Sequence, residues 1–209
     1  MDKNLARKIR DYTDRNQRRI IDLIKELVLV ESPTQAPLSH PRIHDILERE
    51  LSSAGFRCLR KKGRTSGGLF YGSPAERRRG FPVQLILGHC DTVWDIGILE
   101  NGMPLLEEGN LLRGPGVYDM KAGLAQAVFA LKALRELEVV LPITPLFLVT
   151  SDEELGSEDS VKMIRSLARR VRRVLIPEPS YGPEGWLKTS RKRVGRYEIR
   201  VTGKASHPG

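Results

Sequence analysis

Apolar positions near the start of the chain follow a helical period. Over residues 3–30 they recur mostly at three- and four-residue spacing, which predicts one long amphipathic helix. The prolines of "ESPTQAP" (31–37) end this helix, because a proline disfavours the helical conformation in the residue before it. A second helix is predicted from about Pro41 to Ala54, and Gly55 follows it at a position where helices commonly stop.

The middle of the chain alternates between strand patterns and helix patterns. In chain order, strands are expected at 56–61, 67–72, 82–88, 143–150 and 172–178, and helices at 121–137 and 157–170. The stretch "NLLRGPG" (110–116) adds a short strand and a tight turn. This alternation predicts an α/β fold, a mostly parallel central sheet with helices on both faces.

The pattern changes after Pro183. The segment "VGRYEIRVTGK" (194–204) alternates apolar and polar residues, as an antiparallel strand with one exposed face does. We therefore divide the chain into an α/β domain over 1–183 and the start of a second, α+β domain over 184–209.

Composition adds limits. The chain has 209 residues, 40% of them hydrophobic, which is enough for one good core. It has no apolar run of about 18 residues that would span a membrane. Its charged N-terminus lacks the apolar region of a secretory signal. Cys58 and Cys90 are too few for a disulfide framework or a four-cysteine zinc site. We expect a cytoplasmic protein with no membrane partner.

The net charge of +9 raises the question of nucleic-acid binding, because basic patches attract phosphate backbones. Basic clusters lie at 60–64, 77–79, 169–173 and 188–193. Aromatic residues make up only 6% of the chain, and no stacking or recognition motif accompanies the clusters. We interpret them as solvated surfaces and keep a basic nucleic-acid-binding protein as a disfavoured alternative.

Ionisable residues follow three of the apolar strands. They are His89 and Asp91 after the first, Asp152, Glu153 and Glu154 after the second, and Glu178 after the third. Asp119 precedes the helix at 121–137. Sites in open α/β sheets gather at the carboxyl ends of strands, so these groups are expected to converge. One histidine with several carboxylates suits zinc or a similar divalent ion, and carboxylates can bridge two ions.

The pattern also suggests roles. Glu153 and Glu154 are adjacent and should not both face one ion, so one can be a ligand and the other a general base. Asp91 is placed to accept a hydrogen bond from the second ring nitrogen of His89. Each residue also has a structural reading: Asp119 can cap a helix, and Glu178 can be an exposed turn residue.

Other polar candidates are interpreted as structural. His40 and His44 lie four residues apart on a predicted helix without an acidic partner motif, and we expect them on the solvated surface. Cys90 is expected to be a small buried residue beside the site. The stretch "GRTSGG" (63–68) lacks the spacing of a phosphate-binding loop and is expected to form a turn.

Five ordered motifs support a specific resemblance. They are "GHCDTV" (88–93), "GPGVYDMKAG" (114–123), "SDEELGS" (151–157), "PEPS" (177–180) and "GKASHPG" (203–209). The chain resembles, from about residue 5 to its last residue, the zinc-dependent exopeptidase family that includes glutamate carboxypeptidase (carboxypeptidase G), aminoacylase and succinyl-diaminopimelate desuccinylase. The resemblance implies a metallopeptidase or amidohydrolase that acts on a small peptide or an N-acyl amino acid.

The resemblance also implies roles for individual residues. It makes His89 and Glu178 ligands of one zinc, Glu154 a ligand of the second, Asp119 the bridging carboxylate and Glu153 the general base. Asp91 and Glu153 are together the expected catalytic residues. His207 matches a substrate-binding histidine of the family's dimerisation domain, which implies a homodimer. The peptide bond after Asp119 is implied to be cis. Two zinc ions per complete subunit are implied, with cobalt or manganese as alternatives.

The sequence departs from the family in two places. Ala122 replaces the first of two glycines, a small change. The family completes its second zinc with a histidine far downstream, whereas the four histidines here are at positions 40, 44, 89 and 207. Three ligands thus remain for one zinc and two for the other. We expect an N-terminal part of a dizinc peptidase: 1–183 from its catalytic domain and 184–209 the start of its dimerisation domain. The alternative is a catalytically incomplete chain that retains at most one metal site.

Overall fold

The computed structural model describes residues 3–76, 80–190, 192, 195 and 197–204. The chain divides into two units after Pro179. The first unit contains every named helix and strand. His207, the predicted substrate-binding residue, lies outside the described residues. The assignment of the second unit to a dimerisation domain stays a prediction.

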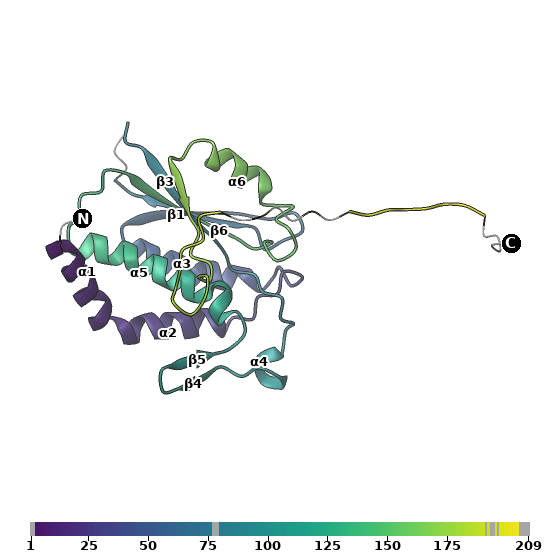
Figure 1. The fold of residues 1–209 in the computed structure, drawn as a ribbon, viewed down its shortest axis with the longest axis horizontal. Helices are drawn as coiled ribbons and strands as arrows, with labels where there is room; N and C mark the ends of the chain where they lie inside the picture. The colour runs from purple at the N-terminus through teal and green to yellow at the C-terminus, as the bar shows by residue number, and fades with distance from the viewer. Residues whose placement is uncertain (1–2, 77–79, 191, 193–194, 196, 205–209) are drawn as a thin grey trace. The chain divides into compact units, whose positions relative to one another are not determined.

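A five-stranded sheet forms the centre of the first unit (Figure 1). Its strands, in spatial order, are β1 (Phe56–Lys61), β2 (Leu69–Pro74), β6 (Thr144–Thr150), β3 (Val83–His89) and β7 (Arg173–Leu175). The pairs β6–β3 and β3–β7 are parallel, whereas β1–β2 and β2–β6 are antiparallel. The α/β architecture is confirmed, with a mixed sheet whose parallel half lies at β6, β3 and β7.

Helices cover both faces of this sheet, as predicted. One face packs against α1 (Lys3–Arg15), α2 (Gln17–Val28), α3 (His40–Ser53) and α5 (Ala122–Glu136) around a large apolar core. On the other side of the sheet, α6 (Val161–Ala168) packs over a smaller core (Figure 1). Every residue of β6 is buried, because β6 lies between two neighbouring strands and two layers of helix.

The predicted helix over 3–30 is wrong in one respect, because it is two helices. The break falls at Asn16, whose backbone leaves the helical region at φ −102° and ψ 6°. The Asn16 side-chain amide donates a hydrogen bond to the Tyr12 carbonyl at 2.9 Å. A short amide side chain that bonds to nearby backbone groups in this way favours a helix end over a helix interior. The apolar period continues through the break, so the sequence pattern alone hides it.

The other predicted elements lie close to their expected positions. The short strand predicted in 110–116 is β5 (Leu111–Arg113), which forms a hairpin with β4 (Leu106–Glu108). A four-residue helix, α4 (Ile98–Asn101), precedes this hairpin. An irregular turn, η1 (Val117–Lys121), leads directly into α5.

The strand predicted in 194–204 is absent from the described residues of that segment, 195 and 197–204. An alternating sequence forms a strand only where a neighbour supplies hydrogen-bond partners. In the described part of the second unit, the backbone pairing is a single bridge between Tyr181 and Trp186. Tyr197, Ile199 and Val201 are accordingly exposed. None of the helices in the described residues is both long and apolar enough to cross a bilayer.

Candidate metal centre

The parallel strands β3 and β6 deliver their polar residues to the same edge of the sheet. His89 ends β3 in register with Thr150, the last residue of β6, and Glu153 and Glu154 follow shortly after. Glu178 follows β7, which runs parallel to β3 on its other side. Asp119 arrives from the η1 turn. The structure thus brings the predicted ligands to the carboxyl ends of the strands, where α/β folds place their sites.

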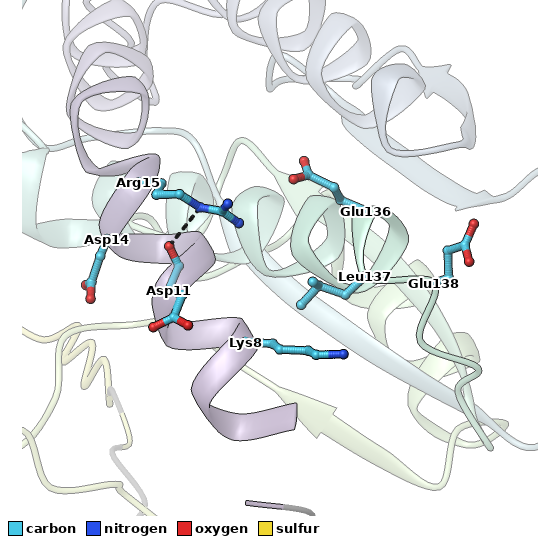
Figure 2. A pocket seen from close by; sticks show the side chains of 7 residues that line it. All are labelled: Lys8, Asp11, Asp14, Arg15, Glu136, Leu137 and Glu138. Atoms are coloured by element: carbon cyan, nitrogen blue, oxygen red, sulfur yellow. Dashed lines mark hydrogen bonds between the residues drawn. The ribbon is translucent and has the colours of Figure 1, made fainter. Parts of the chain in front are cut away.

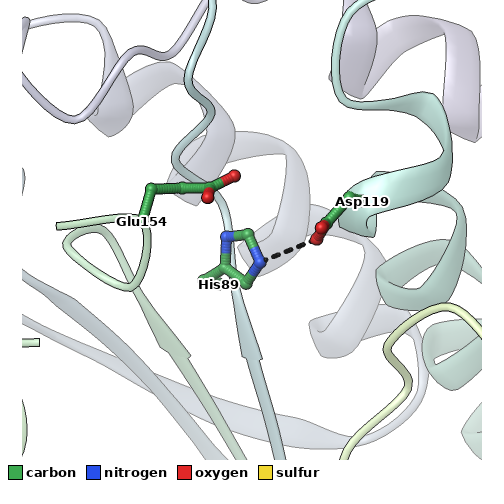
Figure 3. Close-up of side chains that lie close together, drawn as sticks. All are labelled: His89, Asp119 and Glu154. Carbon is green, nitrogen blue, oxygen red and sulfur yellow. Dashed lines mark hydrogen bonds and ion pairs between the residues drawn. The ribbon is translucent and has the colours of Figure 1, made fainter. Parts of the chain in front are cut away.

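Carboxylates surround the His89 ring. Its Nε2 atom lies 3.1 Å from Asp119 Oδ1 and 3.3 Å from Glu178 Oε1. Ligand atoms of His89, Asp119 and Glu154 all lie within 4.8 Å of one another. Figure 3 shows Asp119 and Glu154 on different sides of the imidazole, each coming from a separate segment. An imidazole nitrogen among carboxylate oxygens is a donor set that zinc prefers.

Asp91 holds the His89 ring from behind. The His89 Nδ1 atom lies 3.0 Å from the Asp91 carbonyl oxygen and 3.4 Å from Asp91 Oδ1. The carbonyl oxygen is therefore the nearer acceptor, and the carboxylate that the sequence indicated is the more distant one. In the neutral ring, the form that binds a metal, an Nδ1–H directed at Asp91 leaves the lone pair on Nε2. That nitrogen is the one that faces Asp119 and Glu178.

The pKa shifts describe a site that favours positive charge. Burial alone lowers the pKa of His89, but hydrogen bonds and charge attraction from Asp91 and Glu178 outweigh it and raise the pKa to about 11. Burial raises the pKa of Asp119, and the nearby Glu178 raises it further. Burial likewise raises the pKa of Glu153 and Glu154. Carboxylates gathered in one place repel one another, and a cation among them relieves that repulsion.

The Asp91 carboxylate also holds the segment that carries the two glutamates. Asp91 Oδ1 accepts a hydrogen bond from the Glu153 backbone N–H at 3.2 Å, and Oδ2 accepts one from Glu154 at 3.1 Å. Thr34 donates its hydroxyl to Oδ2 at 2.7 Å. Sequence reasoning did not select Thr34. Its signal was weak, a hydroxyl residue in a proline-rich loop.

Asp152 and Asp159 fix the remainder of the loop after β6. Asp152 Oδ2 accepts hydrogen bonds from the backbone N–H groups of Asp159 and Ser160, just before α6. Asp159 Oδ2 accepts from three consecutive backbone N–H groups, those of Arg64, Thr65 and Ser66. These contacts confirm that "GRTSGG" forms a turn. They place Asp152 in a structural role, and no metal-ligand atom of it joins the cluster found among the described residues.

Gly123 permits the close approach that places Glu178. A Cβ atom on Gly123 would lie 1.7 Å from the Pro177 carbonyl oxygen, so the backbone before Glu178 packs directly on the start of α5. A glycine inside an apolar helix usually has a packing reason, and at Gly123 that reason is the contact with Pro177. The Asp119–Met120 peptide bond is cis, as the resemblance implied.

The prediction of a surface position for His40 and His44 is wrong. Both are buried, with exposed fractions of 0% and 3%. His40 Nε2 lies 3.2 Å from the Ser32 carbonyl oxygen, to which an Nε2–H donates, and the His44 ring lies 5.7 Å from that of Phe70. The face of α3 that carries them packs into the core beneath the loop at 31–34 and Gly67. Cys90 is buried beside the site, as predicted.

A separate cleft of about 740 Å³ lies between α1 and the end of α5. Its side chains carry both signs of charge and include Asp11, Arg15 and Glu136 (Figure 2). It shares no residue with the cluster around His89. The convergent donor set therefore lies elsewhere than this cleft.

Comparison with known proteins finds a peptidase family that this chain matches. The profile of peptidase family M20/M25/M40 matches residues 85–206, which include all five ligand and base candidates. The chain belongs to this peptidase family. Within the M20 family, carboxypeptidase G2 of Pseudomonas sp. (strain RS-16) is 33% identical over 193 residues, covering 91% of this chain and 46% of that protein. Succinyl-diaminopimelate desuccinylase of Caulobacter sp. (strain K31) is 29% identical over 192 residues, covering 86% and 46%.

Solved structures show the same fold. Human carnosine dipeptidase 1 superposes with a TM-score of 0.70 at 19% identity, covering 84% of this chain and 41% of that one. Sso-CP2, an M20 family metallo-carboxypeptidase from Sulfolobus solfataricus, superposes with a TM-score of 0.61 at 19% identity, covering 79% and 38%. The chain spans about half the length of the curated relatives it matches.

Proposed function

We propose that this chain provides the metal-binding part of a zinc-dependent hydrolase that cleaves the amide bond of a small peptide or an N-acyl amino acid. The observation that supports this most is the convergence of the carboxylates of Asp119, Glu154 and Glu178 on the buried His89 imidazole. Relatives named as a carboxypeptidase and a desuccinylase favour amide hydrolysis over other metal chemistry.

The donor set fits two ions that share one carboxylate. His89, Asp119 and Glu178 would hold the first zinc, since Asp119 Oδ1 and Glu178 Oε1 already meet at His89 Nε2. Asp119 and Glu154 would hold the second. When bound, zinc polarises a substrate carbonyl and makes water more acidic. Cobalt or manganese could occupy the same nitrogen and oxygen donors.

Glu153 is the proposed general base. Its side chain is exposed, whereas the neighbouring Glu154 is half-buried and reaches the cluster. The two adjacent backbone amides are bound to the two oxygens of Asp91, which fixes both residues relative to His89. Glu153 takes a proton from the attacking water and returns it to the leaving amine, a task for which a carboxylate in reach of both is suited.

A second candidate is a chain that binds one zinc and does not hydrolyse amides by itself. The unequal donor sets favour it, because three protein ligands serve the first ion and two serve the second. The substrate-binding role of His207 and a homodimer belong to the first proposal. The number of zinc ions bound per chain, measured by calorimetry and metal analysis, separates the two candidates.

The test compares Glu153→Gln with Glu158→Gln, an exposed glutamate of the same loop. We expect Glu153→Gln to bind zinc like the unchanged protein and to lose hydrolysis of N-acyl amino acids and dipeptides by about 10²–10⁴-fold. Glu158→Gln should keep both properties. Full hydrolysis in Glu153→Gln, or after exhaustive chelation, would refute the hydrolase proposal. Zinc binding without hydrolysis in the unchanged chain would select the one-zinc candidate.

A further inference from the structure

The Asp91 carboxylate lies between the His89 ring and the backbone of Glu153 and Glu154. It is buried, with an exposed fraction of 1%. On one side it lies behind the His89 ring, and on the other it binds the backbone N–H groups of Glu153 and Glu154. Its rotation therefore affects where the backbone of Glu153 and Glu154 lies.

Thr34 supplies the contact that distinguishes the two oxygens of this carboxylate. Its hydroxyl donates to Asp91 Oδ2 at 2.7 Å, the shortest of the contacts to that group. Oδ2 then carries Thr34 and the Glu154 amide, and Oδ1 carries the Glu153 amide and faces His89. A buried carboxylate that loses a donor turns toward the donors that remain, because an unpaired buried oxygen is costly.

The loop that carries Thr34 is itself fixed to the segment after β3. The Thr34 N–H donates to the Thr92 carbonyl at 3.3 Å, and the Thr92 N–H donates to the Ser32 carbonyl at 2.9 Å. The Ser32 hydroxyl donates to the Cys90 carbonyl at 2.7 Å. Hydrogen bonds at Thr34 and at Ser32 thus hold the backbone that carries the Thr34 hydroxyl. Thr34 itself is buried, with an exposed fraction of 8%.

We propose that Thr34 is a positioning residue of the metal centre: its hydroxyl fixes the rotation of the Asp91 carboxylate and, through it, the backbone at Glu153 and Glu154. The proposal rests on the proposed function for its metal-binding consequence. Its structural part concerns the backbone amides and can be measured without metal.

The decisive variants are Thr34→Val, which keeps the shape and removes the hydroxyl, and Thr34→Ser, which keeps the hydroxyl. Ser39→Ala is the matched control, because it removes a partly buried hydroxyl from the same connecting segment whose partner is the Ala36 carbonyl rather than the carboxylate. In the metal-free chain, hydrogen exchange of the Glu153 and Glu154 amides is followed by NMR. We expect about tenfold faster exchange in Thr34→Val, with Thr34→Ser and Ser39→Ala close to the unchanged protein.

Zinc affinity is then measured on the same samples. Residues that hold metal ligands commonly change affinity by about 10–100-fold, and we expect the lower end for Thr34→Val because it acts one contact further away. Unchanged amide exchange in Thr34→Val, or equal effects in Thr34→Val and Ser39→Ala, would overturn the inference. If Thr34→Val does not fold, Thr34→Ala against Thr34→Ser makes the same comparison. Faster exchange in a chain whose unchanged form binds no zinc would leave the positioning role standing and refute the proposed function.

Discussion

Two buried histidines in this molecule have opposite properties. His89 and His44 are 1% and 3% exposed, so burial disfavours the charged ring in both. The pKa of His44 falls to about 4, because burial is joined by repulsion from Arg60 and His40. Burial also acts to lower the pKa of His89, yet the carboxylates of Asp91 and Glu178 raise it to about 11. The charges of the neighbouring side chains, and not the depth of burial, decide which histidine lies in surroundings that favour a positive charge.

The difference separates a binding region from a packing region. Around His89 the polar groups converge on Nε2, and a cation there meets several oxygens. Around His44 the neighbour is the Phe70 ring, and Nε2 has no hydrogen-bond partner among the described residues. We expect substitutions in the first region to change zinc binding and substitutions in the second to change stability.

The largest expected effect is at His89. Zinc at about 100 times its Kd should raise the free energy of unfolding of the unchanged protein by about 2.7 kcal/mol. In His89→Ala this increment should disappear, because the nitrogen donor of the first ion is lost. His44→Leu is the control and should keep the increment in full. Thermal melts with and without zinc measure both, and a zinc increment that survives in His89→Ala would contradict the assignment of this ligand.

Acid stability should respond to His44 instead. Its folded-state pKa of about 4 lies below the ordinary value of 6.5, so the unfolded chain binds the proton more strongly. The free energy of unfolding therefore falls as the pH decreases from 6.5 toward 4, by about 2.5 kcal/mol from this residue. His44→Leu should remove that part of the acid loss and stay within about 1 kcal/mol at neutral pH.

Urea unfolding at a series of pH values provides the measurement. Subtracting the curve of His44→Leu from that of the unchanged protein cancels the titration of the carboxylates, which both share. Parallel curves would show that His44 does not stay neutral when the chain is folded.

Gly123 tests whether backbone packing places Glu178. Gly123→Ala puts a Cβ against the Pro177 carbonyl oxygen, which must move away and take Glu178 with it. We expect zinc affinity to weaken about tenfold, as when a supporting contact of a metal ligand is lost. The double variant with Glu178→Gln should bind zinc no more weakly than Glu178→Gln alone, since one cause acts through the other. If calorimetry shows that the losses of zinc affinity in the two single variants add in the double variant, Gly123 does not act through Glu178.

The smallest expected effect is at Gly67, beside His40. A Cβ there would lie 2.1 Å from His40 Nδ1, so Gly67→Ala forces the ring or the loop to shift at a cost of about 1 kcal/mol. Gly203→Ala, where a Cβ meets open space, is the control and should be close to neutral. Both variants should bind zinc normally. Weakened zinc binding in Gly67→Ala would mean that the two regions are coupled.

The sequence was informative where a pattern and a chemistry coincided. Branched apolar runs identified β3 and β6, and the polar residues after them predicted the candidate metal centre, because parallel strands end at a common edge. The same reasoning overestimated the parallel part of the sheet. Pairing direction between β2 and β6 depends on contacts between distant segments, which hydrophobic period does not record.

The errors have a common cause in tertiary contacts. His40 and His44 have the spacing of a surface pair, and only the packing of α3 shows that they face inward. The helix break at Asn16 depends on a side-chain bond to Tyr12 that the apolar period does not reveal. Thr34 became visible only when the loop at 31–34 was placed beside Asp91.

The position of β6 in the sheet also bears on how the molecule is made. This central strand pairs with β2 and β3, both of which are synthesised long before it. Strand pairs that are distant in sequence form slowly, so the sheet stays open until β6 is inserted. His89 and Glu154 come together only after that step, since Glu154 follows β6 directly. Uptake of the proposed second ion, which needs Glu154, by a nascent chain would thus report that β6 has been inserted into the sheet.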